Sequence, residues 1–220
     1  MAKKQFVVIG LGRFGSSVAK TLYAHGSDVL AIDSNETAIR EISDDVTKAI
    51  QMDATDESAL KSLGIRNFDV AVIAIGSDIQ SSIVVTLLVK EFGVKYIIAK
   101  AHNDMHAKIL YKIGATRVVL PEKDMGARVA HNLISSSIVD YIELSPDYSI
   151  TEFVCPQEWN EKTLIQLNLR ANYGINVMAV KRENIVNISP GANEQIESGD
   201  ILVAIVGTNE LSMLETIITR

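Results

Sequence analysis

Short apolar runs alternate, over the first part of the chain, with longer segments in which apolar residues recur at helical spacing. The apolar runs predict β-strands at residues 6–9, 29–32, 47–51, 70–75, 96–100 and 117–120. The amphipathic segments between them predict helices at residues 13–24, 36–42, 56–63, 79–91 and 107–113. Apolar strands separated by helices are typical of a parallel sheet covered on both sides. The pattern therefore predicts an α/β fold with a doubly wound, Rossmann-type parallel sheet.

The pattern changes after Pro121. A long amphipathic segment at residues 122–138 carries apolar residues at helical spacing, namely Met125, Val129, Leu133 and Ile134. Beyond a turn signal, short strands are predicted at residues 150–154, 175–180, 185–188 and 201–206, with helical pieces at 164–167 and 211–218. We therefore predict two domains, a Rossmann-type domain at residues 1–138 that includes the long helix, and a small α+β module at residues 139–220.

Composition and charge limit the partners and the cellular compartment that we expect for the protein. The 220 residues carry a formal net charge of -6 without a cluster of Lys and Arg, so we do not expect a nucleic-acid partner. The longest apolar stretches, such as residues 83–89, fall far short of the ~20 residues of a membrane helix, so we expect no membrane span. The single cysteine, Cys155, cannot form an internal disulfide. Because no signal-type apolar region opens the chain, a cytoplasmic protein is expected.

A glycine-rich turn follows the first predicted strand, at residues 9–15 (IGLGRFG). Gly10 permits a tight turn, Gly12 lets the backbone approach a phosphate, and Gly15 lets the next helix pack on the strand. That helix points free N–H groups and its positive dipole end at a bound anion. Asp33 closes the second strand, where its carboxylate can accept both hydroxyls of an adenosine ribose. The alternative is an ordinary turn, with a solvated Asp33 that caps the next helix.

Arg13 stands inside this turn, where many dinucleotide-binding proteins have a small or apolar residue. Because a guanidinium forms strong paired hydrogen bonds with phosphate, Arg13 suggests a clamp for a terminal phosphate. That favours ATP or ADP as much as NAD(H). A solvent-facing arginine is the alternative, although a cation at the positive end of a helix gains nothing without an anion.

Further candidates follow other predicted strands, at the carboxyl edge where doubly wound sheets bind ligands. Asp53, next to Ala54, could accept a hydrogen bond from the adenine amino group or could cap the next helix. Gly76 and Ser77 leave room for ribose and phosphate, and Lys100 directs a cation at the same edge. A helix cap and a surface lysine with a packed stem are the alternatives.

Glu122 opens the long segment at the domain boundary. It is either a favourable acid in the first turn of a helix or, if the segment crosses to a neighbouring subunit, a ligand of a Mg²⁺ ion beside the phosphates. His102 and His106 have the spacing of half a zinc site, but no third ligand is evident, which favours surface or core histidines. Cys155 is interpreted as a small packed hydrophobic residue.

Four segments together resemble one known family: VIGLGRFG at 8–15, DAT at 53–55, LPEKDMG at 120–126 and LNLRANYGINVMAVKR at 167–182. They are similar, over nearly the whole chain, to the cytosolic regulatory subunits of bacterial Ktr potassium-uptake systems, the KtrA/KtrC family of RCK (TrkA-type) proteins. The glycine turn is shared with many dehydrogenases. The specificity of the resemblance therefore rests on the arginine in that turn, the LPEKDMG segment and the tail together.

The resemblance implies an N-terminal RCK domain that binds ATP, ADP or NAD(H), and a C-terminal TrkA-C module. With the neighbouring residues of the same strand ends, the candidate nucleotide site comprises Gly10, Gly12, Arg13, Phe14, Gly15, Asp33, Asp53, Ala54, Gly76, Ser77, Lys100 and Glu122. It also implies dimers, joined by the helix that begins near Glu122, in an octameric ring beneath a membrane channel dimer. The protein would then lie at the inner face of the cell membrane through its channel partner, and ATP would favour the conducting shape.

Members of the family from Gram-positive bacteria also bind cyclic di-AMP between paired C-terminal modules. The resemblance assigns Arg170 and Asn176 as partners of its phosphates and bases, with Ile165, Ile175 and Pro190 as apolar walls. Arg170 and Asn176 could equally be turn residues around Tyr173-Gly174.

Two other function classes compete with a regulatory subunit, which we expect not to be an enzyme. An NAD-dependent oxidoreductase needs a proton donor or acceptor beside the nicotinamide, usually from the second domain. The predicted second domain contains no histidine. A redox-sensing repressor would need a basic helix-turn-helix segment, which the sequence lacks.

Overall fold

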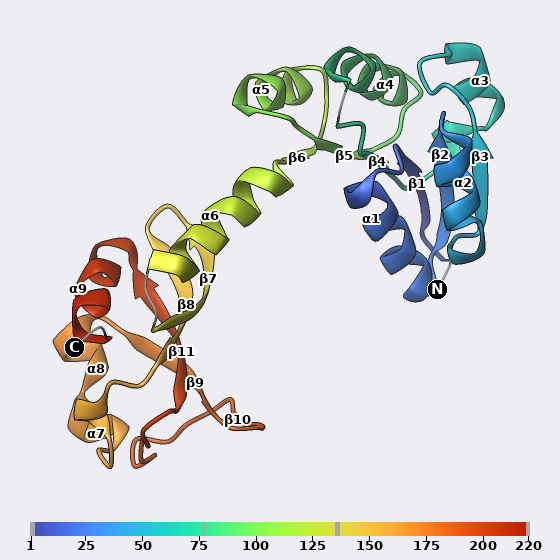
Figure 1. Ribbon diagram of the computed structural model, residues 1–220. Helices are drawn as coiled ribbons and strands as arrows, with labels where there is room; N and C mark the ends of the chain where they lie inside the picture. Colours follow the sequence, from blue (N-terminus) through green and yellow to red (C-terminus); the bar gives the residue numbers. More distant parts are fainter. Residues whose placement is uncertain (1–2, 77, 135–136, 219–220) are drawn as a thin grey trace. The chain divides into compact units, whose positions relative to one another are not determined.

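The computed structural model describes residues 3–76, 78–134 and 137–218, and it divides into two compact units, Met1–Glu122 and Lys123–Arg220 (Figure 1). The contacts thus group the long helix, α6 (Pro121–Ile134), mainly with the second unit. One reason is an ion pair from Arg128 on this helix to Asp140 on the strand that follows it. The sequence places the boundary near residue 138 instead, and the domain to which the helix belongs in an assembly stays a prediction.

The first unit is built on six parallel strands. They are β1 (Gln5–Ile9), β2 (Asp28–Asp33), β3 (Lys48–Gln51), β4 (Val70–Ile73), β5 (Tyr96–Lys100) and β6 (Arg117–Val119). Their order in the sheet is β3-β2-β1-β4-β5-β6, with parallel pairing throughout. The strand order reverses between β1 and β4, which is the switch point of a doubly wound sheet. The predicted Rossmann-type fold is confirmed.

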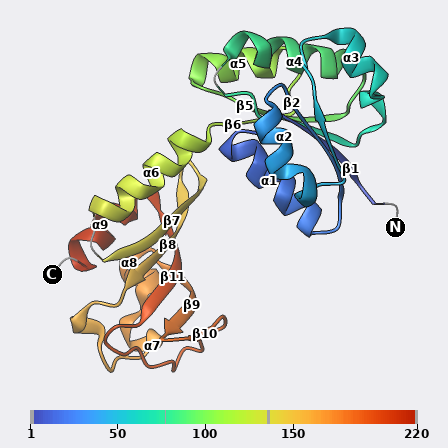
Figure 2. The same ribbon diagram turned by 45° about the vertical axis from the view of Figure 1, so that its right-hand side comes forward.

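Helices cover both faces of this sheet (Figure 2). They are α1 (Arg13–Ala24), α2 (Glu36–Ile42), α3 (Glu57–Ser62), α4 (Ile79–Glu91) and α5 (Asp104–Lys112), with short 3-10 turns at Ser43–Asp45 and Ile65–Asn67. Two apolar clusters separate the layers. Val8 packs with α1 and α2 on one face, whereas Val7 and Ile9 pack with α3, α4 and α5 on the other.

Side-chain caps start four of these five helices. The caps are Asn35 for α2, Asp56 for α3, Asp78 for α4 and Asn103 for α5, and each accepts a hydrogen bond from the first turn of its helix. Asn103 also explains why α5 begins earlier than the predicted residue 107. Helix α1 is the exception. Its N-cap is Gly12, and among the described residues no side chain caps it and no acid stands in its first turn.

The second unit combines an antiparallel sheet with short helices. The strands are β7 (Ile138–Ser145), β8 (Tyr148–Val154), β9 (Asn176–Arg182), β10 (Ile185–Asn187) and β11 (Ile201–Gly207), in the order β10-β9-β11-β8-β7. The helices are α7 (Leu164–Leu167), α8 (Leu169–Tyr173) and α9 (Thr208–Ile218), with a 3-10 turn at Gln157–Trp159. The α+β module is as predicted, but β7 and α8 were not predicted.

A buried carboxylate, Asp200, pairs with a partly exposed arginine in the second unit, whose core is otherwise mainly apolar. Asp200 is 1% exposed, and its two carboxylate oxygens accept hydrogen bonds of 2.8 Å from Nε and Nη2 of Arg182. Hydrogen bonding to Arg182 holds the pKa of Asp200 below its usual value. Cys155 lies beside this pair and is buried, which raises the pKa of its thiol to about 12. It therefore packs as a small hydrophobic residue.

Candidate nucleotide-binding site

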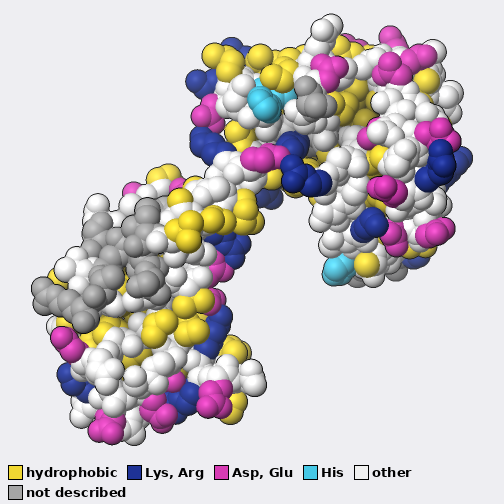
Figure 3. Space-filling model, in the orientation of Figure 1, with side chains coloured by type: hydrophobic (Ala, Val, Ile, Leu, Met, Phe, Trp, Pro, Cys, Tyr) yellow, Lys and Arg dark blue, Asp and Glu magenta, His cyan; other side chains and the backbone are white. Residues whose placement is uncertain are grey.

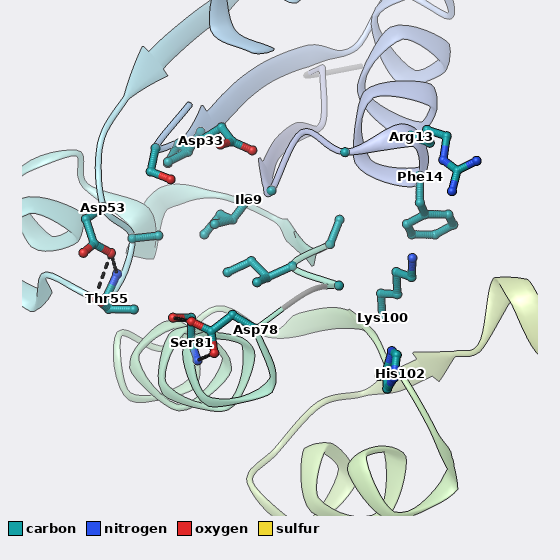
Figure 4. Close-up of a pocket in the computed structure, with 18 of the residues that line it drawn as sticks. Ile9, Arg13, Phe14, Asp33, Asp53, Thr55, Asp78, Ser81, Lys100 and His102 are labelled. Atoms are coloured by element: carbon teal, nitrogen blue, oxygen red, sulfur yellow. Dashed lines mark hydrogen bonds between the residues drawn. The ribbon is translucent and has the colours of Figure 1, made fainter. Parts of the chain in front are cut away.

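A cavity of about 640 Å³ opens at the carboxyl ends of the parallel strands in the first unit (Figure 4). Most of the predicted site residues line it: Gly10, Gly12, Arg13, Phe14, Asp33, Asp53, Ala54, Gly76, Lys100 and Glu122. Gly15 lies behind the glycine turn, and Ser77 falls outside the described residues. The topology accounts for this gathering, because parallel strands deliver all of their following loops to one edge of the sheet.

The three glycines of the turn meet three different constraints. Gly10 has φ +94°, a left-handed conformation that favours glycine, and a Cβ there would lie 2.8 Å from the carbonyl carbon of Ala74. A Cβ on Gly15 would lie 1.8 Å from the carbonyl oxygen of Gly10, so only glycine lets α1 start so close to the turn. A Cβ on Gly12 would meet no atom within 4 Å. Its open space faces the cavity and is room for a ligand.

The amino end of α1 is prepared for an anion by this arrangement. Its first N–H groups lack a capping side chain among the described residues, unlike those of α2, α3, α4 and α5. Uncapped amides together with the helix dipole favour a negatively charged ligand. Arg13, in the same turn of helix, is exposed and has no ion-pair partner among the residues that the structure describes.

One side of the cavity carries carboxylates. Asp33 is held in place by the backbone, because its Oδ2 accepts the N–H of Leu11 at 2.5 Å and its Oδ1 accepts the N–H of Asn35 at 2.8 Å. Asp53 accepts the N–H of Thr55 at 2.9 Å and its hydroxyl at 2.7 Å, both through Oδ1. Asp56, rather than Asp53, caps α3, so the helix-cap alternative for Asp53 is wrong.

The opposite side of the cavity carries cations. The ammonium of Lys100 donates to Oε1 of Glu122 at 2.5 Å, and the lysine side chain is 14% exposed. Gly76 leaves room for it, because a Cβ there would lie 3.2 Å from the ammonium. The pKa of the Glu122 carboxyl is lowered, chiefly by the hydrogen bond from Lys100, with a smaller contribution from the charge of Arg13.

The sheet order explains why the two charges are separated. Asp33 ends β2 and Asp53 follows β3, on one flank of the switch point, whereas Lys100 ends β5, on the other flank. Figure 4 shows Asp33, Asp53 and Thr55 on one side of the cavity and Arg13, Phe14, Lys100 and His102 on the other. The glycine turn lies between these two groups. Such a cavity fits an elongated ligand with hydroxyl groups at one end and an anionic tail at the other.

Comparison with known proteins decides the family. The model of the TrkA-N domain matches residues 6–121, and the model of the TrkA-C domain matches residues 157–219. The chain belongs to the TrkA-type RCK regulatory subunits of Ktr potassium-uptake systems. The Ktr system potassium uptake protein C of Bacillus subtilis (strain 168) is 47% identical over 97% of this chain and 96% of its own length. The corresponding protein A of the same strain is 42% identical over 96% of each.

A solved structure shares the fold of this chain. The GsuK channel bound to NAD superimposes with a TM-score of 0.70 over 99% of this chain and 40% of its own, at 15% sequence identity, which supports the fold alone. Since the curated relatives are potassium-uptake subunits and not enzymes, the prediction of a non-enzyme is confirmed. Among the residues described, no helix is both long and apolar enough for a membrane span.

The RCK fold brings further polar side chains to the cavity that the sequence did not assign to the site. They are Ser34, Thr55, Asp78, Ser81 and His102. Asp78 accepts hydrogen bonds from the hydroxyl and the N–H of Ser81, which lower the pKa of its carboxyl, the hydroxyl bond first. All but Ser81 lie within a few residues of the end of a predicted strand. That position at the carboxyl edge was the signal that could have found them.

The Ktr resemblance implies a Mg²⁺ ligand at Glu122, and the donor set of one chain does not fit that role by itself. The carboxylate already accepts a hydrogen bond from Lys100. Within the described part of the chain, no group of three His, Cys, Asp or Glu side chains could hold a metal ion. Mg²⁺ needs more oxygen ligands than one carboxylate, so Glu122 as a metal ligand stays a prediction that depends on phosphate oxygens.

The residues assigned to cyclic di-AMP lie in the second unit. Ile165 on α7 is 62% exposed, and its N–H donates to the carbonyl of Ala192, close in sequence to Pro190. Arg170 on α8 and Asn176 on β9 are exposed. Ile175 is 1% exposed and packs in the core, so a surface ligand would contact its side chain only if its neighbours moved. The role of these residues stays a prediction.

Proposed function

We propose that this RCK subunit senses adenine nucleotides in the cavity of its first unit and thereby controls potassium uptake by a membrane channel partner. The observation that supports this most is the polarity of the cavity. Fixed carboxylates stand at one end, two cations stand at the other, and the amino end of α1, uncapped by the described side chains, lies between them. Curated relatives named as potassium-uptake proteins support the transport role.

In the proposed complex the ligand lies along this polarity. The ribose hydroxyls donate to the free lone pairs of Asp33, and the adenine amino group donates to Asp53. The phosphates cross Gly12 and end at Arg13 and Lys100. ATP, ADP and NAD(H) share the adenosine part, so they differ in what they place beside the two cations.

A change in the anionic tail can then shift the assembly between two shapes. A ligand shifts such an equilibrium only by its difference in affinity for the two states. A typical coupling of about 1 to 3 kcal/mol per site changes an equilibrium roughly 5- to 150-fold, and several sites in one ring multiply the effect. We propose that ATP favours the conducting shape.

An exposed apolar face on α6 supports the proposed homo-oligomer. Met125, Val129 and Leu133 share this face and are 55%, 48% and 79% exposed in the single chain. Figure 3 shows hydrophobic side chains on the surface along this helix. Burial of such a face in a partner is favourable by about 25 cal/mol per Å² of apolar surface. We propose dimers joined through this helix, which assemble into an octameric ring at the cytoplasmic face of the membrane.

Ligand-dependent thermal unfolding of the full chain tests the proposal. At 100 times their dissociation constants, ATP and ADP should stabilise the protein by about 2.7 kcal/mol, which melting curves detect. Cyclic di-AMP, proposed from the residue pattern of the C-terminal module, should stabilise the wild type but not Arg170→Ala, which should respond to ATP as before. Stabilisation by NADH alone, in a protein that oxidises a hydroxy acid, would overturn the proposal.

The ion pair between Lys100 and Glu122 leads to a second test. Without divalent cations, the phosphates must compete with Glu122 for Lys100, so Glu122→Gln should bind ATP roughly two- to fivefold more tightly in EDTA. Asp45→Asn, which breaks the exposed pair of Asp45 with Lys20, is the matched control and should leave ATP affinity unchanged. Calorimetric titration measures both. Weaker ATP binding by Glu122→Gln in EDTA would contradict the competition.

A further inference from the structure

His102 is a cavity residue that the proposed function has not used. It follows β5 by two residues and lines the cavity on the same side as Lys100 and Arg13 (Figure 4). Its side chain is exposed. Histidine is the side chain whose ordinary pKa, about 6.5, allows it to gain a proton near neutral pH.

The backbone of His102 is held by a second, buried histidine. His106 on α5 is 2% exposed, and its Nδ1 accepts the N–H of His102 at 3.2 Å. Its own N–H donates at 2.8 Å to Oδ1 of Asn103, the cap of α5. Because Nδ1 acts as an acceptor, the proton of neutral His106 is on Nε2. These two hydrogen bonds, from the N–H of His102 to His106 and from the N–H of His106 to Asn103, hold the loop that carries His102.

The two histidines have different roles: His106 holds the backbone of His102 through a hydrogen bond, and His102 presents its ring to the cavity. Burial lowers the pKa of His106, and the nearby His102 lowers it further. His106 is thus neutral near neutral pH, which preserves its bond to the N–H of His102. Of the two rings, that of His102 is the exposed one.

The elements that line the cavity beside His102 carry charges of both signs. They are Arg13 on α1, Asp78 before α4, Lys100 on β5 and Glu122 on α6, whereas α5 carries the neutral ring of His106. Glu122 is already bonded to Lys100. A phosphate tail at this end would add two or more negative charges beside the ring. An opposite charge within about 4 to 6 Å favours the protonated form of a histidine.

We propose that His102 is a proton-linked specificity residue, which binds a proton when a terminal phosphate arrives and so favours the nucleotide with more phosphate at lower pH. The inference rests on the proposed nucleotide site and adds the regulation of that site. Potassium uptake controlled by this subunit would then respond to pH as well as to the ratio of ATP to ADP.

Calorimetric titration of ATP at pH 7, in two buffers with different ionisation enthalpies, measures the protons taken up on binding. A histidine whose pKa rises by one unit from about 6.5 takes up about half a proton at pH 7. We expect the wild type to take up about half a proton more per bound ATP than His102→Gln does. The control variant His25→Gln, at the far end of α1, should take up as many protons as the wild type. With ADP the difference should be smaller.

The pH dependence of affinity gives a second measurement. Between pH 6 and pH 8 the dissociation constant of ATP should rise by up to about tenfold more in the wild type than in His102→Gln. In nuclear magnetic resonance titrations of the wild type, ATP should raise the pKa of the His102 ring. Tight ATP binding with equal proton uptake in both proteins would overturn this inference alone. Absence of ATP binding would overturn the proposed function as well.

Discussion

Arg13→Ala should bind ATP roughly ten- to hundredfold more weakly, with a much smaller loss for AMP. Hydrogen bonds between charged partners contribute about 1.5 to 3 kcal/mol, and Arg13 is a cation in the cavity whose charge no described carboxylate compensates in an ion pair. Because AMP has no terminal phosphate to reach the guanidinium, its affinity reports only the adenosine contacts. Calorimetric titrations of AMP, ADP and ATP measure how the loss of affinity grows with the number of phosphates.

Arg40→Ala is the matched control for this experiment. Arg40 also lies on a helix of the first unit, but it pairs with Glu36 on the surface of α2 and does not line the cavity. Its removal should leave all three affinities within a factor of two, since exposed pairs of this spacing contribute only about 0.3 to 0.5 kcal/mol. An equal loss of AMP and ATP affinity in Arg13→Ala would show that Arg13 is no clamp for the terminal phosphate.

Gly15→Ala should mainly lower the stability of the protein, whereas Gly12→Ala should mainly lower its affinity for nucleotide. A Cβ on Gly15 would lie 1.8 Å from a backbone oxygen, which cannot move without the turn. We expect a loss of at least about 3 kcal/mol in the free energy of unfolding, measured by thermal or urea unfolding. A Cβ on Gly12 meets nothing within 4 Å, and its backbone is extended, with φ -66°. Its cost to stability should be about 0.5 kcal/mol, the usual difference between Gly and Ala at an N-cap.

Gly12→Ala should instead lose nucleotide affinity, roughly tenfold or more. The added methyl group would occupy the space through which a phosphate approaches the first N–H groups of α1. The two variants thus separate a folding role from a binding role within one turn. If Gly12→Ala bound ATP as the wild type does, the phosphates would not cross the turn where we place them.

Local patterns predicted most of the fold, because its elements follow from apolar periodicity and from caps. Helices α2 and α4 and strand β5 have the predicted bounds. Strand β7 was missed because polar Asp140 and Glu143 interrupt its apolar alternation, and its first residue, Ile138, was assigned to the preceding helix. Asp140 is stabilised there by Arg128, a tertiary contact that sequence periodicity does not contain.

In the candidate site, too, the features set by local sequence could be predicted, and those set by tertiary contacts could not. The glycine turn and Asp33 could be predicted because their spacing along the chain is the signal. The pairing of Lys100 with Glu122 could not, since it depends on how two side chains 22 residues apart meet across one edge of the sheet. The sequence left His102 as half of a metal site with His106 or, in preference, as a surface or core histidine, and did not assign it to the nucleotide site. The structure shows that the two histidines meet through a backbone N–H instead.

Calorimetric titration of ATP into the purified full chain tests the central claim most directly, namely that a phosphate tail binds at the amino end of α1. The account predicts saturable binding of one ATP per chain, which Gly12→Ala weakens and which inorganic phosphate alone does not match in affinity. If ATP, ADP and NADH all failed to produce a binding heat in a folded protein, the claim would be contradicted.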